Sequence, residues 1–319
     1  MKLAFILDQL DSIKTYKDSS FAMMHAAASR DHQLFTLQQG DLAWKGDQTV
    51  GFARALELSG GVDRADGHRW YRTDEPQEIP LQEFDAVLMR KDPPFDMEYV
   101  YSTYLLELAE SQGARVFNSP RAVRDHNEKL AIAKFPQFTP PTLVTRQESL
   151  IRNFLAEHRD IVLKPLDGMG GASVFRIHSA DHNISVIIET LTHYGTRTIM
   201  VQRYIPEIAQ GDKRILLIAG EPVPYTLARI PRPGETRGNL NAGATGVAQP
   251  LTTRDRAIAE ALGPALHDKG LMLVGLDVIG DYLTEINVTS PTCMQEIADQ
   301  TGFNSAEMMM DALEKNVFP

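Results

Sequence analysis

The chain has 319 residues, 43% of them hydrophobic and 23% charged, which is typical of a globular protein with more than one domain. Its formal net charge of −10 disfavours long-range attraction to DNA or RNA, so we expect no nucleic-acid partner. No apolar run reaches the roughly 18 residues that span a bilayer, and the single cysteine, Cys293, excludes an internal disulfide. We therefore expect no membrane partner and a cytoplasmic location.

The first 124 residues alternate short apolar runs with helical patterns. Strands are predicted at 3–7, 86–92 and 115–118, and helices at 18–30, 97–113 and from 120 onward. Asp18 or Ser19 is the expected N-cap of the first helix, and Pro93 stops the second strand. The stretch 42–73 reads only as irregular hairpins. The alternation predicts an α/β domain with a parallel sheet over residues 1–124.

The remainder of the chain changes to helices mixed with hairpins. Helices are predicted at 127–135, 147–158, 184–192 and 254–270, strands at 160–166, 172–178 and 198–205, and hairpins at 213–230 and 271–288. The hairpins are expected to turn at Gly220-Glu221 and near Gly280-Asp281. This pattern predicts an α+β domain with antiparallel sheets over residues 125–319.

A glycine-rich loop follows a lysine-bearing strand in "VLKPLDGMGGASVF". Gly168, Gly170 and Gly171 separate two strand-like runs, and Lys164 lies just before the loop. The spacing is neither that of a Walker phosphate loop nor that of a dinucleotide fingerprint. The loop is either a plain hairpin turn or a flexible cover whose amide groups close over phosphates, with Lys164 as a point charge at their edge.

Two carboxylates and an amide occur in the last predicted hairpin, "GLDVIGDYLTEINV". Glu285 and Asn287 are two residues apart and share one face of a strand. If the turn is a three-residue loop from Gly280 to Tyr282, Asp277 lies opposite Glu285 on that face; a two-residue turn would point Asp277 away. We predict the three-residue turn. Such an oxygen set suits Mg²⁺, although strand-end acids facing water are the alternative.

Arginines mark two further places. The stretch from Leu227 to Gly246 has four glycines and three arginines without an apolar period, which favours a functional lid that captures an anionic substrate. Arg90 ends a predicted strand of the first domain, where open α/β sheets bind their ligands. Cys293 is expected to be a buried residue at a helix start, without a catalytic role.

Taken together, these segments resemble the ATP-grasp ligases and, more closely, the bacterial glutathione synthetase family. The resemblance rests on "KDSSFAM", "LMRKDPPFD", "NEKL", "LKPLDGMGGAS", "GDKR", "EPVPY", "LARIP…GETRGNL", "GLDVIGD" and "LTEINVTSPTC", in that order. It implies a substrate-binding domain at 1–124, followed by an ATP-grasp fold whose central subdomain, 125–201, and C-terminal subdomain, 202–319, clasp ATP between antiparallel sheets. It also implies an enzyme that joins γ-glutamylcysteine and glycine into glutathione through an acyl phosphate, releasing ADP and phosphate.

The resemblance assigns roles to residues of this sequence. Its implied ATP contacts are Lys129, Lys164, Gly168, Gly170, Gly171, Gln202, Arg203, Tyr204, Ile205 and Asp212. Two Mg²⁺ ions, which Mn²⁺ could replace, are implied at Asp277, Glu285 and Asn287. Substrate and acyl phosphate are implied at Arg90, Arg214, Arg229 and Asn287, with Arg214, Arg229 and Lys164 as the catalytic set.

Two further points follow from the resemblance. A homo-oligomer, specifically a tetramer, is implied, and the loop 230–246 is similar to the mobile cover of the family. Near the end of that cover we expect a basic residue in relatives, whereas this chain has Thr245. Another ATP-grasp carboxylate–amine ligase, such as a D-alanine–D-alanine ligase or a ribosomal-protein glutamate ligase, is the alternative enzyme; a nucleotide-binding regulator and a structural protein are the alternative classes.

Overall fold

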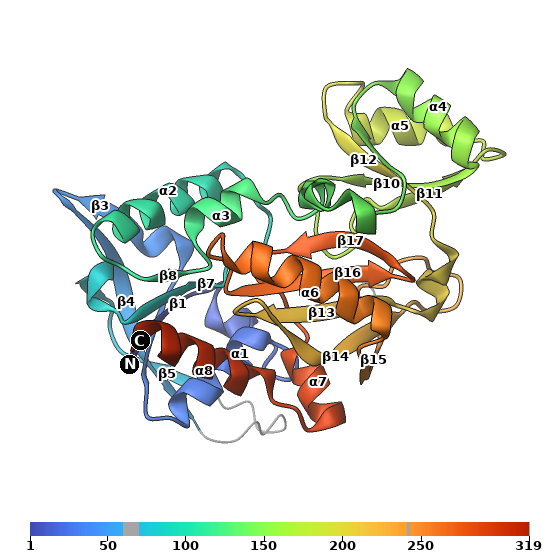
Figure 1. Ribbon diagram of the computed structural model, residues 1–319. Coiled ribbons are helices and arrows are strands. Elements are labelled where there is room, and N and C mark those ends of the chain that lie inside the picture. Colours follow the sequence, from blue (N-terminus) through green and yellow to red (C-terminus); the bar gives the residue numbers. More distant parts are fainter. Residues whose placement is uncertain (60–69, 241–242, 319) are drawn as a thin grey trace.

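The described residues of the computed structural model, shown in Figure 1, form three β-sheets. The structure describes residues 1–59, 70–240 and 243–318. The first sheet is formed by residues before position 118, and the other two are formed by residues after position 141. The predicted combination of an α/β part with an α+β part that has antiparallel sheets is confirmed.

The first sheet has a parallel centre. Its central order is β2-β1-β7-β8, formed by β1 (Lys2–Ile6), β2 (Gln33–Leu37), β7 (Ala86–Met89) and β8 (Val116–Phe117). Strand β1 is buried on both faces, with Leu3 and Phe5 packing on one side and Ala4 and Ile6 on the other. This explains its unbroken apolar sequence, which is typical of a parallel strand covered on both faces.

Antiparallel strands extend this sheet, most of them in the stretch 42–73 that was predicted as irregular hairpins. They are β3 (Leu42–Lys45), β4 (Gln48–Leu58), β5 (Tyr71–Thr73) and β6 (Gln77–Pro80). Strand β4 pairs with β2 and with each of the other three. The sheet is therefore mixed rather than wholly parallel. The part of the predicted hairpin region at 60–69 lies outside the described residues.

Helices of the first part lie where the sequence predicts, although α1 and α2 each end two residues earlier than predicted. They are α1 (Ser19–Ala28), α2 (Met97–Ser111) and α3 (Pro120–Asp125). Asp18 is the N-cap of α1 and accepts a hydrogen bond from the backbone N–H of Phe21 at 2.8 Å. Gly113, at φ +102°, follows the end of α2, and Pro120 opens α3.

The second sheet is antiparallel and has four strands in the order β11-β10-β12-β9. Its elements are β9 (Thr142–Thr145), α4 (Glu148–His158), β10 (Asp160–Pro165), β11 (Phe175–His178), α5 (Ile184–Thr192) and β12 (Ile199–Arg203). Ile161, Leu163 and Val201 pack with α4 and α5 on one face. Val162, Lys164 and their partners across the sheet therefore occupy the opposite face. Strand β11 starts three residues later than predicted.

The third sheet is also antiparallel, with five strands in the order β15-β14-β13-β16-β17. Its elements are β13 (Asp212–Ile218), β14 (Glu221–Ile230), β15 (Thr245–Pro250), α6 (Thr253–His267), β16 (Leu273–Ile279) and β17 (Tyr282–Asn287). Ala219 and Gly220, both at positive φ, form the β13–β14 turn, one position before the predicted one. Ile215 and Leu217 of β13 belong to the same core cluster as α6.

The last two helices connect the third sheet to the first. Helix α7 (Met294–Thr301) begins after Cys293, which is buried as predicted, and α8 (Ser305–Val317) packs against α1. Arg30 forms ion pairs with Glu307, Asp311 and Glu314 of α8. Figure 1 shows α8 beside α1.

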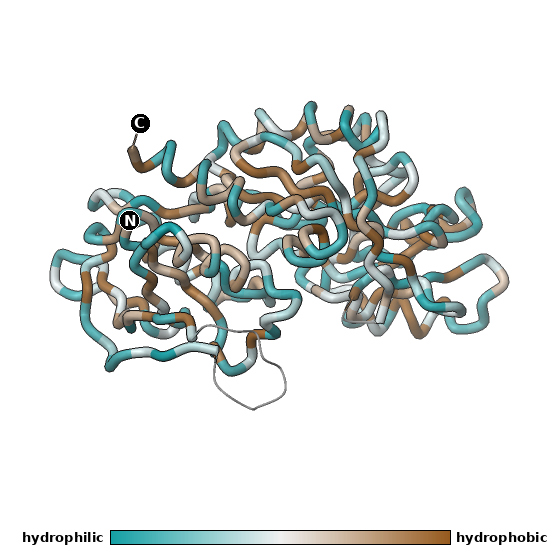
Figure 2. The backbone as a smooth tube through the Cα atoms, turned by 90° about the horizontal axis from the view of Figure 1, so that it is seen from below, coloured by the Kyte–Doolittle hydropathy of each residue, from teal (hydrophilic) through white to brown (hydrophobic). Residues whose placement is uncertain are grey.

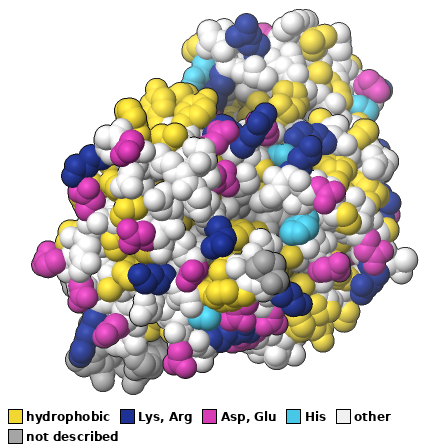
Figure 3. Space-filling model, turned by 60° about the vertical axis from the view of Figure 1, so that its left-hand side comes forward, with side chains coloured by type: hydrophobic (Ala, Val, Ile, Leu, Met, Phe, Trp, Pro, Cys, Tyr) yellow, Lys and Arg dark blue, Asp and Glu magenta, His cyan; other side chains and the backbone are white. Residues whose placement is uncertain are grey.

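Hydropathy along the backbone agrees with this arrangement. In Figure 2 hydrophobic stretches of the tube run through the interior, while many of the outer turns are hydrophilic. On the face shown in Figure 3, acidic and basic side chains alternate over the surface instead of forming one basic region. Among the described residues, no helix is both long and apolar enough to cross a membrane.

Candidate active site

Strand register gathers charged residues on one face of the third sheet. The register pairs are Asp212 with Arg229, Arg214 with Asp277, Asp277 with Glu285, and Gly275 with Asn287. Because paired residues of antiparallel strands point to the same side, these side chains share one face across β14, β13, β16 and β17. A single sheet face thus carries three carboxylates, two arginines and one amide.

The pairing of Asp277 with Glu285 arises differently from our prediction. The turn has two residues, Gly280 and Asp281, because Ile279 pairs with Tyr282. A regular ladder from that turn would place Asp277 opposite Thr284. A β-bulge between Asp277 and Val278 shifts the register by one residue and restores the opposition to Glu285. The predicted three-residue turn is therefore wrong, whereas the predicted opposition is confirmed.

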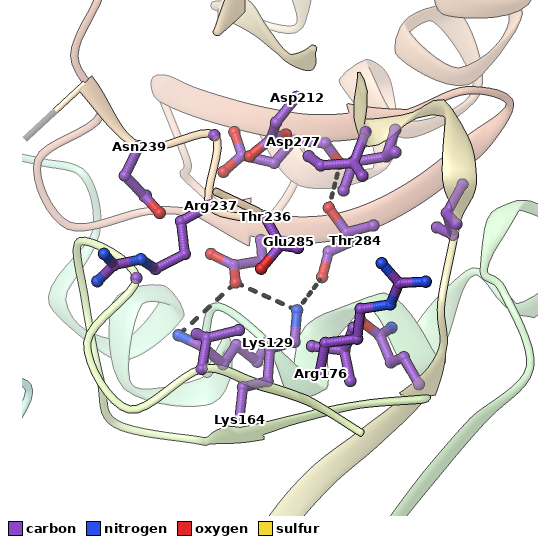
Figure 4. Close-up of a pocket in the computed structure, with 18 of the residues that line it drawn as sticks. Lys129, Lys164, Arg176, Asp212, Thr236, Arg237, Asn239, Asp277, Thr284 and Glu285 are labelled. Carbon is purple, nitrogen blue, oxygen red and sulfur yellow. Dashed lines mark hydrogen bonds and ion pairs between the residues drawn. The ribbon is translucent and has the colours of Figure 1, made fainter. Parts of the chain in front are cut away.

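Two lysines face Glu285 from the other side of the site, as Figure 4 shows. Lys164 Nζ, on β10, lies 3.2 Å from Glu285 Oε1 and 3.4 Å from the carbonyl oxygen of Thr284. Lys129 Nζ lies 3.8 Å from the same Oε1. Burial and the charge of Lys129 lower the pKa of Lys164 despite the nearby carboxylate. The carboxylate is thus shared by two buried cations.

Lys129 is positioned by an element that the sequence did not predict correctly. The predicted helix at 127–135 is a 3₁₀ helix, η4 (Leu130–Lys134), and Lys129 lies just before it. The carbonyl oxygen of Glu128 accepts a hydrogen bond from Ile286 N of β17. This bond fixes the segment beside the third sheet. Lys129 Nζ also donates to the carbonyl oxygen of Gly168 at 2.5 Å, which joins it to the glycine loop.

Asp277 lies between two arginines. Its Oδ1 accepts from Arg214 Nε at 2.5 Å, and its Oδ2 lies 3.0 Å from Arg229 Nη2. Burial alone would raise the pKa of Asp277, but the two guanidinium groups outweigh burial and hold the pKa below its ordinary value. Asp277 therefore stays ionised at neutral pH.

Asp212 extends this network to β14. Its Oδ2 accepts from Arg229 Nη2 at 2.5 Å, while its Oδ1 is buried without a hydrogen-bond partner among the described residues. Burial raises the pKa of Asp212 to about 6, against the pull of Arg229. A buried carboxylate oxygen without a donor is costly, so it marks a position where a ligand supplies the missing contact.

The donor set fits a hard divalent cation only in part. Among the described residues, no group of three or more His, Cys, Asp or Glu side chains is placed to hold a metal. Asp277 and Glu285 are two carboxylates in register, and Asn287 donates from Nδ2 to the carbonyl oxygen of Gly275, which leaves its amide oxygen as an acceptor. A Mg²⁺ ion here would complete its octahedron with water and oxygens of a bound anion.

The first of two adjoining cavities lies between the second and third sheets. It is lined by all the residues predicted to contact ATP: Lys129, Lys164, Gly168, Gly170, Gly171, Gln202, Arg203, Tyr204, Ile205 and Asp212. Val162, Ile208 and Ile279 add apolar surface that suits an aromatic base. Arg176, which the sequence did not single out, covers the ring of Tyr204 at 3.5 Å from its centroid and pairs with Asp160.

The glycine loop and the long loop between β14 and β15 meet over this cavity. A Cβ atom on Gly171, at φ +79°, would lie 2.5 Å from Asn239 Oδ1 and 3.1 Å from Arg237 Cδ. Only glycine therefore permits this approach. We name residues 231–244 the cover; positions 241 and 242 lie outside the described residues. Thr245 begins β15 and pairs with Ile230, so it closes the base of the cover.

The second cavity borders the first sheet. It is lined by Arg90, Arg214, Arg229 and Asn287, the residues predicted to contact substrate, and it shares Asp277 and Glu285 with the first cavity. Arg90 donates from Nε to Ser20 Oγ at 3.1 Å and from Nη2 to the carbonyl oxygen of Pro291 at 2.8 Å. These two bonds orient the guanidinium and leave Nη1 available to a ligand.

Several lining residues escaped the sequence analysis. Arg176 looked like one residue of an alternating strand, and Asn239 was only part of a loop rich in glycine. Glu128 lines the second cavity and accepts from Thr289 Oγ1 and from two backbone N–H groups. Glu128 follows Asp125, His126 and Asn127 in a polar segment, so its residue type gave no signal for this role.

Comparison with known proteins places this geometry in a family. The model of the prokaryotic glutathione synthetase N-terminal domain matches residues 1–124, and that of the prokaryotic glutathione synthetase ATP-grasp domain matches residues 128–302. A glutathione synthetase from Nitrosomonas europaea is 72% identical over 99% of this chain and 98% of its own length. One from Pseudomonas aeruginosa is 55% identical over 98% of this chain and 97% of its own.

Solved structures agree on the fold at much lower identity. The D-cycloserine synthetase DcsG aligns with a TM-score of 0.67 at 17% identity, covering 99% of both chains. The ATP-grasp ligase PsnB, in a complex with a precursor variant, Mg and ADP, aligns with a TM-score of 0.63 at 18% identity, covering 99% of this chain and 98% of its own. On the strength of the two domain models and the full-length relatives, this chain belongs to the prokaryotic glutathione synthetase family.

Proposed function

We propose that the two adjoining cavities together form the active site of a glutathione synthetase. The chain is an ATP-dependent ligase that joins γ-glutamylcysteine and glycine, with release of ADP and phosphate. The observation that carries the site assignment is the meeting of Lys129 and Lys164 with Glu285 between two antiparallel sheets. Buried cations and carboxylates so arranged are unfavourable for folding alone, so we infer that they serve a ligand.

The nucleotide occupies the first cavity in this proposal. Lys129 and Lys164 neutralise phosphate charge, and the amide groups at Gly168, Gly170 and Gly171 approach the phosphates. The backbone and side chains from Gln202 to Ile205 contact the base. Asp212, whose Oδ1 has no described partner, accepts a hydrogen bond from a ribose hydroxyl.

A divalent metal accompanies ATP in this family. We propose two Mg²⁺ ions, replaceable by Mn²⁺, held by Asp277, Glu285 and Asn287 together with phosphate oxygens. When bound, such ions neutralise phosphate charge and polarise the bond between the β and γ phosphates. Ion pairs with Lys129, Lys164, Arg214 and Arg229 also balance the charge of Asp277 and Glu285.

The second cavity receives the dipeptide and glycine. An oxygen of the cysteinyl carboxylate attacks the γ phosphorus, the bond to the ADP oxygen breaks, and an acyl phosphate forms. The amine of glycine then attacks the acyl carbon, the carbon–oxygen bond to phosphate breaks, and the amine loses a proton. Arg214 and Arg229 balance the negative charge that gathers in both steps, and Arg90 binds a carboxylate of the dipeptide.

Exclusion of water protects the acyl phosphate from hydrolysis. The glycine loop and the cover meet at Gly171 and Asn239 above the site, and this contact supports a role for the two loops as a joint lid. Arg237 of the cover, paired with Glu235, brings a further cation to the first cavity. Thr245 lies in β15, at the base of the cover.

Phosphate release during turnover tests the proposal directly. The protein with ATP, Mg²⁺, γ-glutamylcysteine and glycine should yield phosphate and glutathione in equal amounts. Replacement of glycine by D-alanine, or of the dipeptide by a glutamate-terminated peptide, should abolish turnover. The high identity to glutathione synthetases does not favour the D-alanine–D-alanine ligase or glutamate ligase alternatives. Absence of phosphate release from folded protein would refute the proposal.

Three organisational points belong to the same proposal. We propose domains at 1–124 and 125–319, the latter with subdomains at 125–201 and 202–319, and a cytoplasmic homotetramer. The exposed stripe Met97, Tyr101, Tyr104 and Leu108 along α2, at spacings of one helical turn, supports self-association. Light scattering should give four chains per particle, and Tyr104→Glu should lower that number; a wild-type monomer would contradict the tetramer.

A further inference from the structure

One carboxylate in the second cavity has no role in the mechanism above. Glu296 lies in the first turn of α7 and lines the cavity together with Arg90 and Lys17. Its Oε2 atom is buried and has no hydrogen-bond partner among the described residues. Burial raises the pKa of Glu296, and a hydrogen bond from its own backbone N–H and the charge of Lys17 offset only part of that effect.

The other acids that line this cavity have partners. Asp8, Asp277 and Glu285 form ion pairs with lysine or arginine side chains. Asp18 caps α1, Asp92 is hydrogen-bonded to Ser290, and Glu128 accepts a hydrogen bond from Thr289. Among these acids, Glu296 alone has a buried oxygen that receives no hydrogen bond from the described residues. A buried carboxylate with an unmet oxygen favours an incoming cation.

Glu296 and Arg90 line the same cavity, and both are connected to the start of α1. Ser19 Oγ accepts from Met294 N at the start of α7, and the adjacent Ser20 Oγ accepts from Arg90 Nε. Gln295 also links α7 to the segment before α1, because its Nε2 donates to the carbonyl oxygens of residues 15 and 18. A cation-binding carboxylate and an anion-binding guanidinium therefore sit on a shared framework of α1 and α7.

We propose that Glu296 and Arg90 together bind the α-amino-acid end of the γ-glutamyl group. Glu296 binds its ammonium group, and Arg90 binds its carboxylate. The inference rests on the proposed function and adds a residue that determines specificity. Both charges of that end are carried by one carbon, so its recognition requires a carboxylate and a cation side by side. Glycine is a poorer fit for Glu296, because its amine must be uncharged to attack the acyl phosphate.

The proposal predicts discrimination by charge. A dipeptide analogue with a glutaryl group in place of γ-glutamyl has the same carboxylate but lacks the ammonium. Wild-type protein should use this analogue with a kcat/KM about 10- to 100-fold lower than for γ-glutamylcysteine, since it leaves a buried charged group unpaired. Equal use of the two dipeptides by the wild type would overturn the proposal without any variant.

The variant Glu296→Gln tests the residue itself. It should raise the KM for γ-glutamylcysteine about 10- to 100-fold, leave the KM for ATP unchanged, and cause no loss in the use of the glutaryl analogue, because the unpaired charge is removed. Asp299→Asn removes the same charge from an exposed position of the same helix and should behave as wild type. Equal losses with both dipeptides, or no loss with either, would overturn the assignment of Glu296.

The outcome also separates this inference from the proposed function. If the wild type releases no phosphate with γ-glutamylcysteine, glycine and ATP, the proposed function fails. If the wild type is active and distinguishes the two dipeptides but Glu296→Gln retains that distinction, only the role of Glu296 fails. Thermal unfolding of both variants, compared with the wild type, checks that the corner formed by α1 and α7 remains intact.

Discussion

Replacement of Glu285 by glutamine examines the centre of the site in most detail. Glu285 Oε1 lies 3.2 Å from Lys164 Nζ and 3.8 Å from Lys129 Nζ, and it is also a proposed metal ligand. Glutamine keeps the size of the side chain but removes the charge that both lysines and the metal require. The ion pair with Lys164 is buried, so its loss should lower the free energy of unfolding by about 1–3 kcal/mol.

The loss of turnover should be larger than the loss of stability. A preorganised charge contact to transferring groups is worth about 2.7–4 kcal/mol, so we expect kcat to fall about 100- to 1000-fold at saturating ATP and Mg²⁺. Coupled phosphate release measures kcat, and chemical denaturation measures stability. Glu221→Gln, at an exposed position of β14, serves as the matched control. A kcat for Glu285→Gln within threefold of wild type would refute the metal and phosphate assignment.

Three further perturbations test other parts of the account. Lys164→Met should weaken binding of a non-hydrolysable ATP analogue about 10- to 100-fold in calorimetry, because a charged contact is lost; unchanged affinity would contradict its role. Gly171→Ala should separate the glycine loop from the cover, so that phosphate release exceeds glutathione formation; equal yields would argue against a joint lid. Glu110→Gln should stabilise the protein at pH 8 but not at pH 4. Burial and the charge of Glu107 raise the pKa of Glu110 to about 7 in the folded state. The free energy of unfolding therefore falls as the pH rises from the pKa of an unperturbed glutamate to about 7. The gain should be about 1 kcal/mol after allowance for solvent screening; a gain independent of pH would contradict it.

Local sequence signals predicted most elements of the fold. The N-cap at Asp18, the helix start at Pro120 and the helix end near Gly113 follow from chemistry within a few residues, and the structure agrees. The individual strands β3, β4, β5 and β6 were not predicted, because these segments carry no clear alternation of apolar and polar residues. Strand β4 pairs with the other three. Such pairing depends on tertiary contacts and not on local propensity.

The residues of the site were easier to predict from the sequence than the way in which their side chains are arranged. The opposition of Asp277 and Glu285 depends on a β-bulge at Thr284, and no residue type in that stretch announces one. Likewise, Arg214 and Arg229 were assigned to substrate, whereas their contacts with Asp277 and Asp212 come from the order of strands in the sheet. No feature of the sequence pointed to Glu296. It stands out only in the structure, where its buried Oε2 atom has no hydrogen-bond partner among the described residues.

The fate of one oxygen atom tests the central claim that phosphoryl transfer activates the carboxylate between Lys164 and Arg214. γ-Glutamylcysteine labelled with ¹⁸O in its cysteinyl carboxylate should be converted with glycine and unlabelled ATP, and the released phosphate analysed by mass spectrometry. One ¹⁸O atom is expected in each phosphate, because the attacking carboxylate oxygen leaves with the phosphoryl group, while the second ¹⁸O stays in the new amide. Unlabelled phosphate, with the departed ¹⁸O found in water or in ADP instead, would contradict phosphoryl activation.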